Sequence, residues 1–157
     1  MGLLRKLYGL LITIASAFQS VLLLVIRLYW GWQFAQAGWG KLQHLDRVTK
    51  FFTSLGIPMP HANAIFISVL ELVGGILLAL GLSSRLIALL FVGDMVVAYI
   101  TADHEAFFSF ISDPDKFVAA SPFAFLLASL VILVFGPGRF SLDALLGRWF
   151  TKRTSRK

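Results

Sequence analysis

The chain has 157 residues, of which 58% are hydrophobic and only 14% are charged, and its mean hydropathy is +0.83. A soluble domain usually carries about 25% charged residues, so this composition excludes an ordinary soluble protein. It predicts a single all-α membrane domain over residues 1–150 and a basic tail over residues 151–157. The chain contains no cysteine, which excludes disulfides, thiol catalysis and cysteine-ligated iron–sulfur clusters. The net charge of +6 is typical of membrane topology and contact with anionic lipid, and we expect no nucleic-acid partner.

The first apolar stretch, residues 7–40, is too long for one membrane span. We expect a short interfacial helix near residues 3–16, followed by a span over about residues 18–39 that contains Arg27. The alternative places residues 7–26 across the membrane and leaves Arg27 at an interface. Residues 15–17 read Ala-Ser-Ala, which resembles a signal-peptide cleavage site. We interpret this match as a coincidence and expect the segment to be retained.

Three further spans follow, over about residues 62–82, 86–102 and 117–135, which together predict a four-transmembrane-helix bundle. Two short amphipathic helices are expected outside the spans. One lies in the first outer loop, where apolar residues recur at helical spacing: Val48, Phe51, Phe52 and Leu55. The other follows the helix-stopping residues 136–138, and Ser141 is its expected cap.

The orientation of the bundle follows from the distribution of Lys and Arg. With four spans, both termini and the turn at residues 81–85 share one side, which carries nine basic residues against four on the other side. The nine are Arg5, Lys6, Arg85, Arg139, Arg148, Lys152, Arg153, Arg156 and Lys157. The positive-inside rule therefore predicts a multi-pass protein of the inner membrane of a prokaryote, with both termini in the cytoplasm.

Three ionisable residues lie inside apolar runs: Arg27, Glu71 and Asp94. A charge at the centre of a bilayer costs roughly 2.5–3.5 kcal/mol on insertion scales, so we expect the three to face one another. One acid would then pair with Arg27, and the other would hold a proton, share one or meet a ligand. These residues are the candidate catalytic groups for proton handling or quinone contact. The alternative is a buried network that only fixes helix packing.

Weaker candidates lie nearby. Trp39, Lys41 and Ser68 could contact a flat cofactor, although the tryptophans of the first span are more typical of an interfacial belt. His44, His61 and His104 all fall in outer loops, but their spacing matches no ligand motif, so we expect neither haem nor a metal site.

Several motifs together resemble the DoxX family of small four-helix bacterial and archaeal membrane proteins. They are Gly38-Trp39-Gly40-Lys41-Leu42, the run ELVGGILLALGL from Glu71 to Leu82, Asp94-Met95-Val96-Val97-Ala98, and GPGRFSLD from Gly136 to Asp143. The resemblance covers about residues 21–146. Within it, Arg27, Lys41, Glu71, Arg85, Asp94 and residues 141–143 match the family pattern, which assigns them no mechanism.

The resemblance implies a respiratory or oxidative-stress context, because the family includes subunits that accompany quinol oxidase and thiosulfate:quinone oxidoreductase. We therefore expect a subunit of a membrane oxidoreductase system, with electrons supplied by partner subunits, rather than a stand-alone enzyme. The alternative is a non-enzymatic assembly factor, chaperone or structural subunit. Proton-coupled transport is less favoured, because four helices without inverted repeats leave little room for alternating access unless the protein forms a homo-oligomer.

Overall fold

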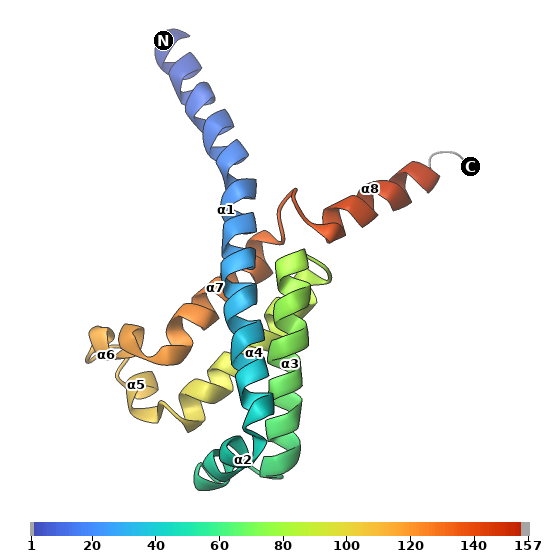
Figure 1. The fold of residues 1–157 in the computed structure, drawn as a ribbon. Helices are drawn as coiled ribbons and strands as arrows, with labels where there is room; N and C mark the ends of the chain where they lie inside the picture. The colour runs from blue at the N-terminus through green and yellow to red at the C-terminus, as the bar shows by residue number, and fades with distance from the viewer. Residues whose placement is uncertain (1, 155–157) are drawn as a thin grey trace.

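The computed structural model describes residues 2–154 and is all-helical over that range, without a strand. Eight helices follow one another along the chain, and Figure 1 shows their arrangement. They are α1 (Gly2–Gln43), α2 (Leu45–Ser54), α3 (Pro60–Leu80), α4 (Ser84–Thr101), α5 (His104–Phe108), α6 (Pro114–Ala119), α7 (Ser121–Phe135) and α8 (Leu142–Thr154). Residues 155–157 of the expected tail lie outside the described residues.

The first apolar stretch forms one continuous helix, not the expected interfacial helix followed by a separate span. α1 has 42 residues, and at 1.5 Å per residue it is about 63 Å long. The stretch contains no proline that would break the helix. The helix also continues through Gly9, whose carbonyl oxygen accepts a hydrogen bond from the Thr13 hydroxyl at 2.9 Å. The first half extends beyond the end of α3 (Figure 1), and residues 4–19 are all exposed.

The second and third expected spans agree with α3 and α4 to within two residues. α3 ends at Leu80 and is capped by Gly81, whose φ of 73° is left-handed, a conformation that glycine adopts without steric cost. Ser83 also has a positive φ of 51°. Two residues in left-handed conformation reverse the chain within a few positions, so α4 returns beside α3.

The fourth expected span is shorter than predicted. Residues 117–135 do not form one helix, because α6 ends at Ala119 and α7 begins at Ser121, with Ala120 extended between them (φ −66°, ψ 139°). Pro122 explains the interruption: proline lacks an N–H to donate and is favoured in the first turn of a new helix. α7 therefore has 15 residues.

The bundle consists of two helix pairs that cross obliquely. α1 packs along α3, α4 packs along α7, and the contacts between the pairs are fewer (Figure 1). The α1–α3 pair approaches closely because glycines face one another: a Cβ placed on Gly75 would lie 2.5 Å from the Ala35 nitrogen and the Gly31 oxygen. Such close approach through small residues is typical of membrane helices.

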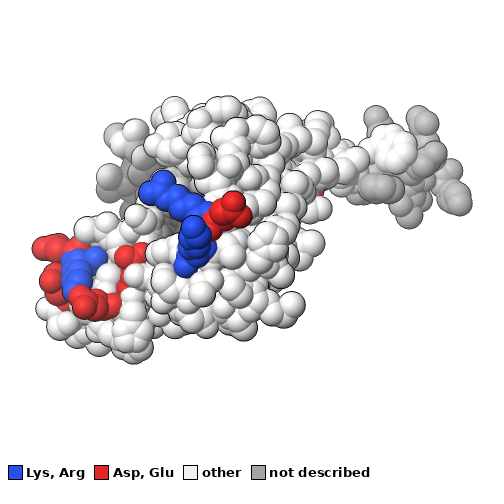
Figure 2. All heavy atoms as spheres, turned by 60° about the horizontal axis from the view of Figure 1, so that its bottom comes forward, with Lys and Arg blue, Asp and Glu red and all other residues white. Residues whose placement is uncertain are grey.

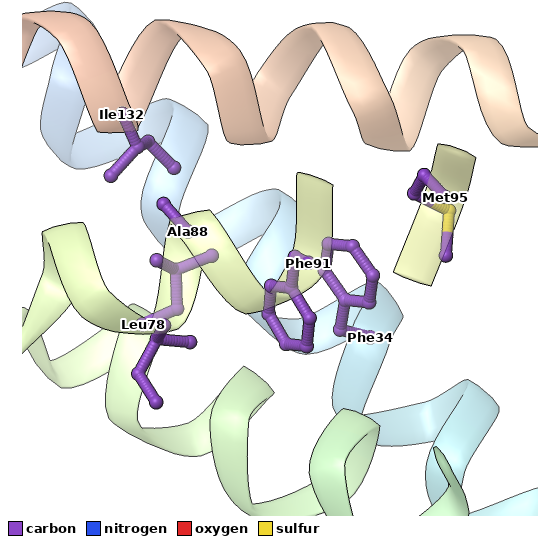
Figure 3. Packing of buried hydrophobic residues seen from close by; sticks show 7 residues of the cluster. Phe34, Leu78, Ala88, Phe91, Met95 and Ile132 are labelled. Atoms are coloured by element: carbon purple, nitrogen blue, oxygen red, sulfur yellow. The ribbon is translucent and has the colours of Figure 1, made fainter. Parts of the chain in front are cut away.

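Side chains from all four long helices form the core (Figure 3). Phe34 of α1 stacks on Phe91 of α4, with ring centroids 3.7 Å apart and planes 8° from parallel. Leu78 of α3 and Ile132 of α7 are fully buried in the same cluster. Within residues 2–154, α1, α3 and α4 are long and apolar enough to cross a membrane, and α7 is a shorter apolar helix.

Candidate functional site

A large pocket lies between α2, α3 and α4. Its volume is about 920 Å³, which is near the upper end of the range for small-molecule sites. Its walls are mainly apolar and aromatic: Val48, Phe51, Phe52, Leu55 and Ile57 from the α2 region, Phe66, Ile67 and Leu70 from α3, and Leu89, Leu90, Met95 and Val97 from α4. The amphipathic helix expected in the first outer loop is therefore present as α2, and its apolar face forms one wall.

Four charged residues line this apolar pocket: Lys41, Arg47, Glu71 and Asp94. The Arg47 side chain is exposed on α2. Lys41 Nζ donates a hydrogen bond to Glu71 Oε1 at 2.5 Å, and the side chains are 33% and 3% exposed. Glu71 Oε2 and Asp94 Oδ2 are buried and have no hydrogen-bond partner. Lys41 thus pairs with Glu71, and one buried oxygen of each acid has no partner beside the pocket.

Helix packing explains why Lys41 reaches Glu71. A Cβ on Gly38 would lie 2.6 Å from the Ser68 carbonyl oxygen, so α1 passes very close to α3 one turn before Glu71. Lys41 is one turn beyond Gly38 on the same face of α1, which brings its ammonium group level with the Glu71 carboxylate. Because Asp94 shares a face of α4 with Leu90, Ala98 and Thr101, which also line the pocket, it approaches the same place from the opposite side.

Arg27 does not join this group, contrary to the expectation that it would pair with one of the acids. It lies 14 residues before Lys41 on α1, which is about 21 Å along the helix. Its guanidinium group is buried at the opposite end of the bundle, where Nη2 donates to the Phe140 carbonyl oxygen at 2.6 Å. The error has a simple cause: the apolar run of α1 is much longer than one span, so the middle of the run is not the middle of the bundle.

The segment of residues 136–143 closes that opposite end of the bundle. Asp143 accepts hydrogen bonds from the backbone nitrogens of Ser83 (2.8 Å) and Ser84 (2.9 Å), which are free donors at the start of α4. The Asp143 nitrogen in turn donates to the Gly81 carbonyl oxygen at 2.9 Å. Ser141 is the expected cap of α8, because its hydroxyl accepts from the Ala144 nitrogen at 3.1 Å. The GPGRFSLD run therefore joins α1, the α3–α4 turn and α8.

Two of the weaker cofactor candidates are not at the pocket. Trp39 lines a separate groove of about 530 Å³ between α1 and α3 and is 55% exposed. Ser68 is fully buried, and its hydroxyl donates to the Ala64 carbonyl oxygen at 2.6 Å. Lys41 is the one candidate of this group that lines the pocket. Sequence reasoning also missed Gly93, which lines the pocket and whose missing side chain leaves open space there.

The histidines do not form a cluster. His44 Nδ1 lies 3.0 Å from the Gly40 carbonyl oxygen, and His61 Nδ1 lies 3.3 Å from the Thr49 hydroxyl. The His104 ring packs against Phe108 with centroids 4.5 Å apart. Among the described residues, no group of three or more His, Asp or Glu side chains could hold a metal ion.

Comparison with known proteins identifies the family. The DoxX family profile matches residues 22–104, which is more than half of the chain. The chain belongs to the DoxX family. It is 30% identical over 131 residues to Inner membrane protein YphA of Escherichia coli, covering 82% of this chain and 92% of the relative. It is also 30% identical over 120 residues to "Putative oxidoreductase CatD" of Bacillus subtilis, covering 76% of this chain and 83% of the relative. No solved structure matches it.

Family membership agrees with the helical structure, so the chain is a membrane protein of the DoxX family whose apolar helices contact the lipid bilayer. The matched region contains all four charged residues of the pocket, Lys41, Arg47, Glu71 and Asp94. It stops before the segment of residues 136–143 that closes the other end of the bundle.

Proposed function

We propose that this DoxX-family protein is an integral membrane subunit of an oxidoreductase system and that its pocket binds a quinone-class small molecule. The observation that carries the proposal is the pair of unpartnered carboxylate oxygens, on Glu71 and Asp94, beside a large apolar pocket. Buried polar atoms without partners are rare in folded proteins, so each one calls for an explanation. A mainly apolar pocket with a few convergent polar groups is the usual form of a small-molecule site.

The charged groups would serve the ligand in different ways. Lys41 neutralises part of the negative charge of the two acids, and its remaining N–H groups can donate to a ligand oxygen. Glu71 and Asp94 would accept hydrogen bonds from the head of the ligand or take up its protons. The apolar walls from α2, α3 and α4 would hold the ring and the first part of a hydrocarbon tail. Electrons would pass to or from partner subunits.

The cellular setting is part of the proposal. One relative is named "Inner membrane protein" and another "Putative oxidoreductase", which supports an inner-membrane location and a redox context for this chain. The excess of Lys and Arg on the terminal side supports a cytoplasmic location of both termini. The pocket would then lie in the half of the bundle that faces away from the cytoplasm.

A substitution that fills the pocket provides a direct test of ligand binding. Gly93→Leu adds a side chain where a Cβ meets no atom within 4 Å, so it should occupy the pocket without disturbing the fold. Gly9→Leu is the matched control, because Gly9 has the same open surroundings on the exposed half of α1. Quinones extracted from each purified protein are measured by chromatography. We expect bound quinone in the wild type and in Gly9→Leu, and its loss in Gly93→Leu.

The proposal fails if the wild type carries no quinone and also shows no saturable binding of an added short-tailed quinone or quinol. Monodisperse elution of Gly93→Leu at the wild-type position would establish that a loss of ligand does not result from unfolding.

A second candidate function is a non-enzymatic assembly or structural subunit. Two sets of contacts favour it. Arg27 donates to the Phe140 carbonyl oxygen, and Asp143 accepts from the backbone nitrogens of Ser83 and Ser84. These charged groups fix helix positions. In that case Glu71→Gln and Asp94→Asn should lower the yield of folded protein and of its complexes without a separate loss of quinone-dependent activity. Co-purification of partner subunits with each variant separates the two functions.

A further inference from the structure

The unpartnered oxygen of Glu71 restricts the chemistry of any ligand that approaches it. Glu71 Oε1 accepts from Lys41 Nζ in an ion pair, and a neighbouring cation favours the ionised form of a carboxyl group. An ionised carboxylate accepts hydrogen bonds and donates none. Its Oε2 atom is buried without a partner, and a buried acceptor left unpaired loses the stabilisation that water would have provided. The missing partner must therefore be a hydrogen-bond donor.

Among the described residues that line the pocket, none donates a hydrogen bond to Glu71 Oε2. Asn63 donates through Nδ2 to the Pro58 carbonyl oxygen at 2.7 Å, and the Thr101 hydroxyl donates to the Val97 carbonyl oxygen at 2.7 Å. The hydrogen bond from Lys41 goes to the other oxygen of Glu71. Arg47 is exposed on α2. The donor for Glu71 Oε2 is therefore left for the ligand to supply.

Asp94 adds a second requirement in the same pocket, because its Oδ2 atom is also buried and unpaired. A hydroxyl group can both donate and accept, so it pairs with Asp94 whether that side chain carries a proton or not. A carbonyl oxygen can only accept. It could meet Lys41 or a protonated Asp94, but it leaves Glu71 Oε2 without a partner.

We infer that the pocket binds the reduced, dihydroxy-aromatic form of a quinone, the quinol, in preference to the oxidised form. This inference rests on the proposed function and adds the redox state that the site selects. The two forms have nearly the same size and the same hydrocarbon tail, so the apolar walls do not distinguish them. Selection comes from the hydroxyl that donates to Glu71 Oε2.

The preference for quinol can be measured as the ratio of quinol and quinone affinities and as a shift in the midpoint potential of the bound couple. Leaving a buried acceptor unpaired corresponds to about a tenfold loss in affinity, so quinol should bind about ten times more tightly than quinone. Tighter binding of the reduced form raises the midpoint potential of the bound couple. For a two-electron couple, a tenfold ratio corresponds to about 30 mV.

The test uses a decyl-substituted benzoquinone, its quinol and the dimethyl ether of that quinol, with the full chain in lipid nanodiscs under anaerobic conditions. Binding is measured by equilibrium dialysis, and the uptake of empty nanodiscs is subtracted. We expect the quinol to bind about tenfold more tightly than both other compounds, because the dimethyl ether keeps the ring and the tail but has no hydroxyl to donate. In Glu71→Gln, the amide supplies a donor of its own, so the preference should fall to about twofold or less.

The outcomes separate this inference from the proposed function. Equal affinity for quinol and quinone in the wild type would overturn the inference and leave quinone-class binding intact, as would equal affinity for the quinol and its dimethyl ether. Failure of all three compounds to bind would overturn both. If Glu71→Gln does not fold, the comparison with the dimethyl ether in the wild type decides the question alone.

Discussion

Lys41 at the end of α1 and Glu71 in the middle of α3 form an ion pair, with Nζ 2.5 Å from Oε1. The pair lies where α1 and α3 are closest, beside the pocket between α2, α3 and α4. Its position gives it two consequences. It fixes the register of the α1–α3 packing, and it turns one carboxylate oxygen of Glu71 toward Lys41 while the other stays unpaired.

The ion pair predicts the behaviour of Lys41→Met. The substitution leaves the Glu71 carboxylate buried without its cation, so the free energy of unfolding should fall by about 2 kcal/mol. Denaturant unfolding in detergent micelles, followed by helical circular dichroism, measures the change. Lys50→Met on the exposed face of α2 is the control and should be neutral. A Lys41→Met protein as stable as the control would show that the pair contributes nothing.

Gly75, in the α1–α3 interface, and Gly93, beside the open pocket, should respond to alanine in opposite directions. Gly75→Ala places a methyl group 2.5 Å from backbone atoms of α1, so the helices must separate, at a cost of about 2 kcal/mol or more. Gly93→Ala has open space and replaces glycine within a helix, so it should leave stability unchanged or raise it by up to about 1 kcal/mol. Thermal unfolding of both variants in the same detergent tests the contrast. Equal stability would contradict the close packing of α1 on α3.

Arg27 should hold the segment of residues 136–140 in place. Arg27→Met removes the donor to the Phe140 carbonyl oxygen, and we expect this segment to become open to protease in folded protein. Arg139→Met removes an exposed charge in the same region and should leave the cleavage rate unchanged. Mass spectrometry of the fragments from limited proteolysis locates the cut. Equal resistance of the two variants would mean that other contacts are sufficient.

Asp143 caps the first turn of α4 with both carboxylate oxygens. Asp143→Ala frees two backbone N–H groups and should reduce the free energy of unfolding by about 1–2 kcal/mol. Asp143→Asn keeps one acceptor oxygen and should fall between Asp143→Ala and the wild type. The order of the three midpoints in a thermal melt is the measurement. Asp46→Ala, on exposed α2, provides a comparison of the same chemical change outside the contact.

The pair of Glu105 and Lys116 should respond to pH. The two side chains form a hydrogen-bonded ion pair at 2.8 Å on the surface of α5 and α6. Figure 2 shows basic and acidic side chains next to one another on the face of the molecule that is at the bottom of Figure 1. The hydrogen bond and the positive charge of Lys116 lower the pKa of Glu105 below its ordinary value. The contact between α5 and α6 is therefore at full strength above the ordinary pKa of Glu and is lost as pH falls through the lowered pKa.

A titration of the Glu105 carboxyl carbon by NMR measures this pKa directly. Lys116→Met should return it toward the ordinary value, and high salt should do so in part, because exposed ion pairs are screened. A pKa that does not change in Lys116→Met would rule out the assigned cause.

Much of the architecture could be predicted from local patterns. Hydrophobic length and the turn at residues 81–85 placed α3 and α4 to within two residues, because helix ends follow from side chains close in sequence. The spacing of Phe51 and Phe52 with their apolar neighbours predicted the helix α2. The interruption at Ala120 also has a local signal in Pro122, which the expected continuous span over residues 117–135 does not take into account.

The candidate site, too, could be predicted from local patterns only in part. The sequence by itself determined that Glu71 and Asp94 lie on faces with small or polar neighbours, since a helical face is a matter of spacing alone. Only the tertiary structure decided which cation meets them. α1 is about 63 Å long, so its position relative to α3 depends on where Gly31 and Gly38 meet the backbone of α3. That contact places Lys41 beside Glu71 and leaves Arg27 at the far end of the bundle, because packing between helices depends on shape across the whole interface.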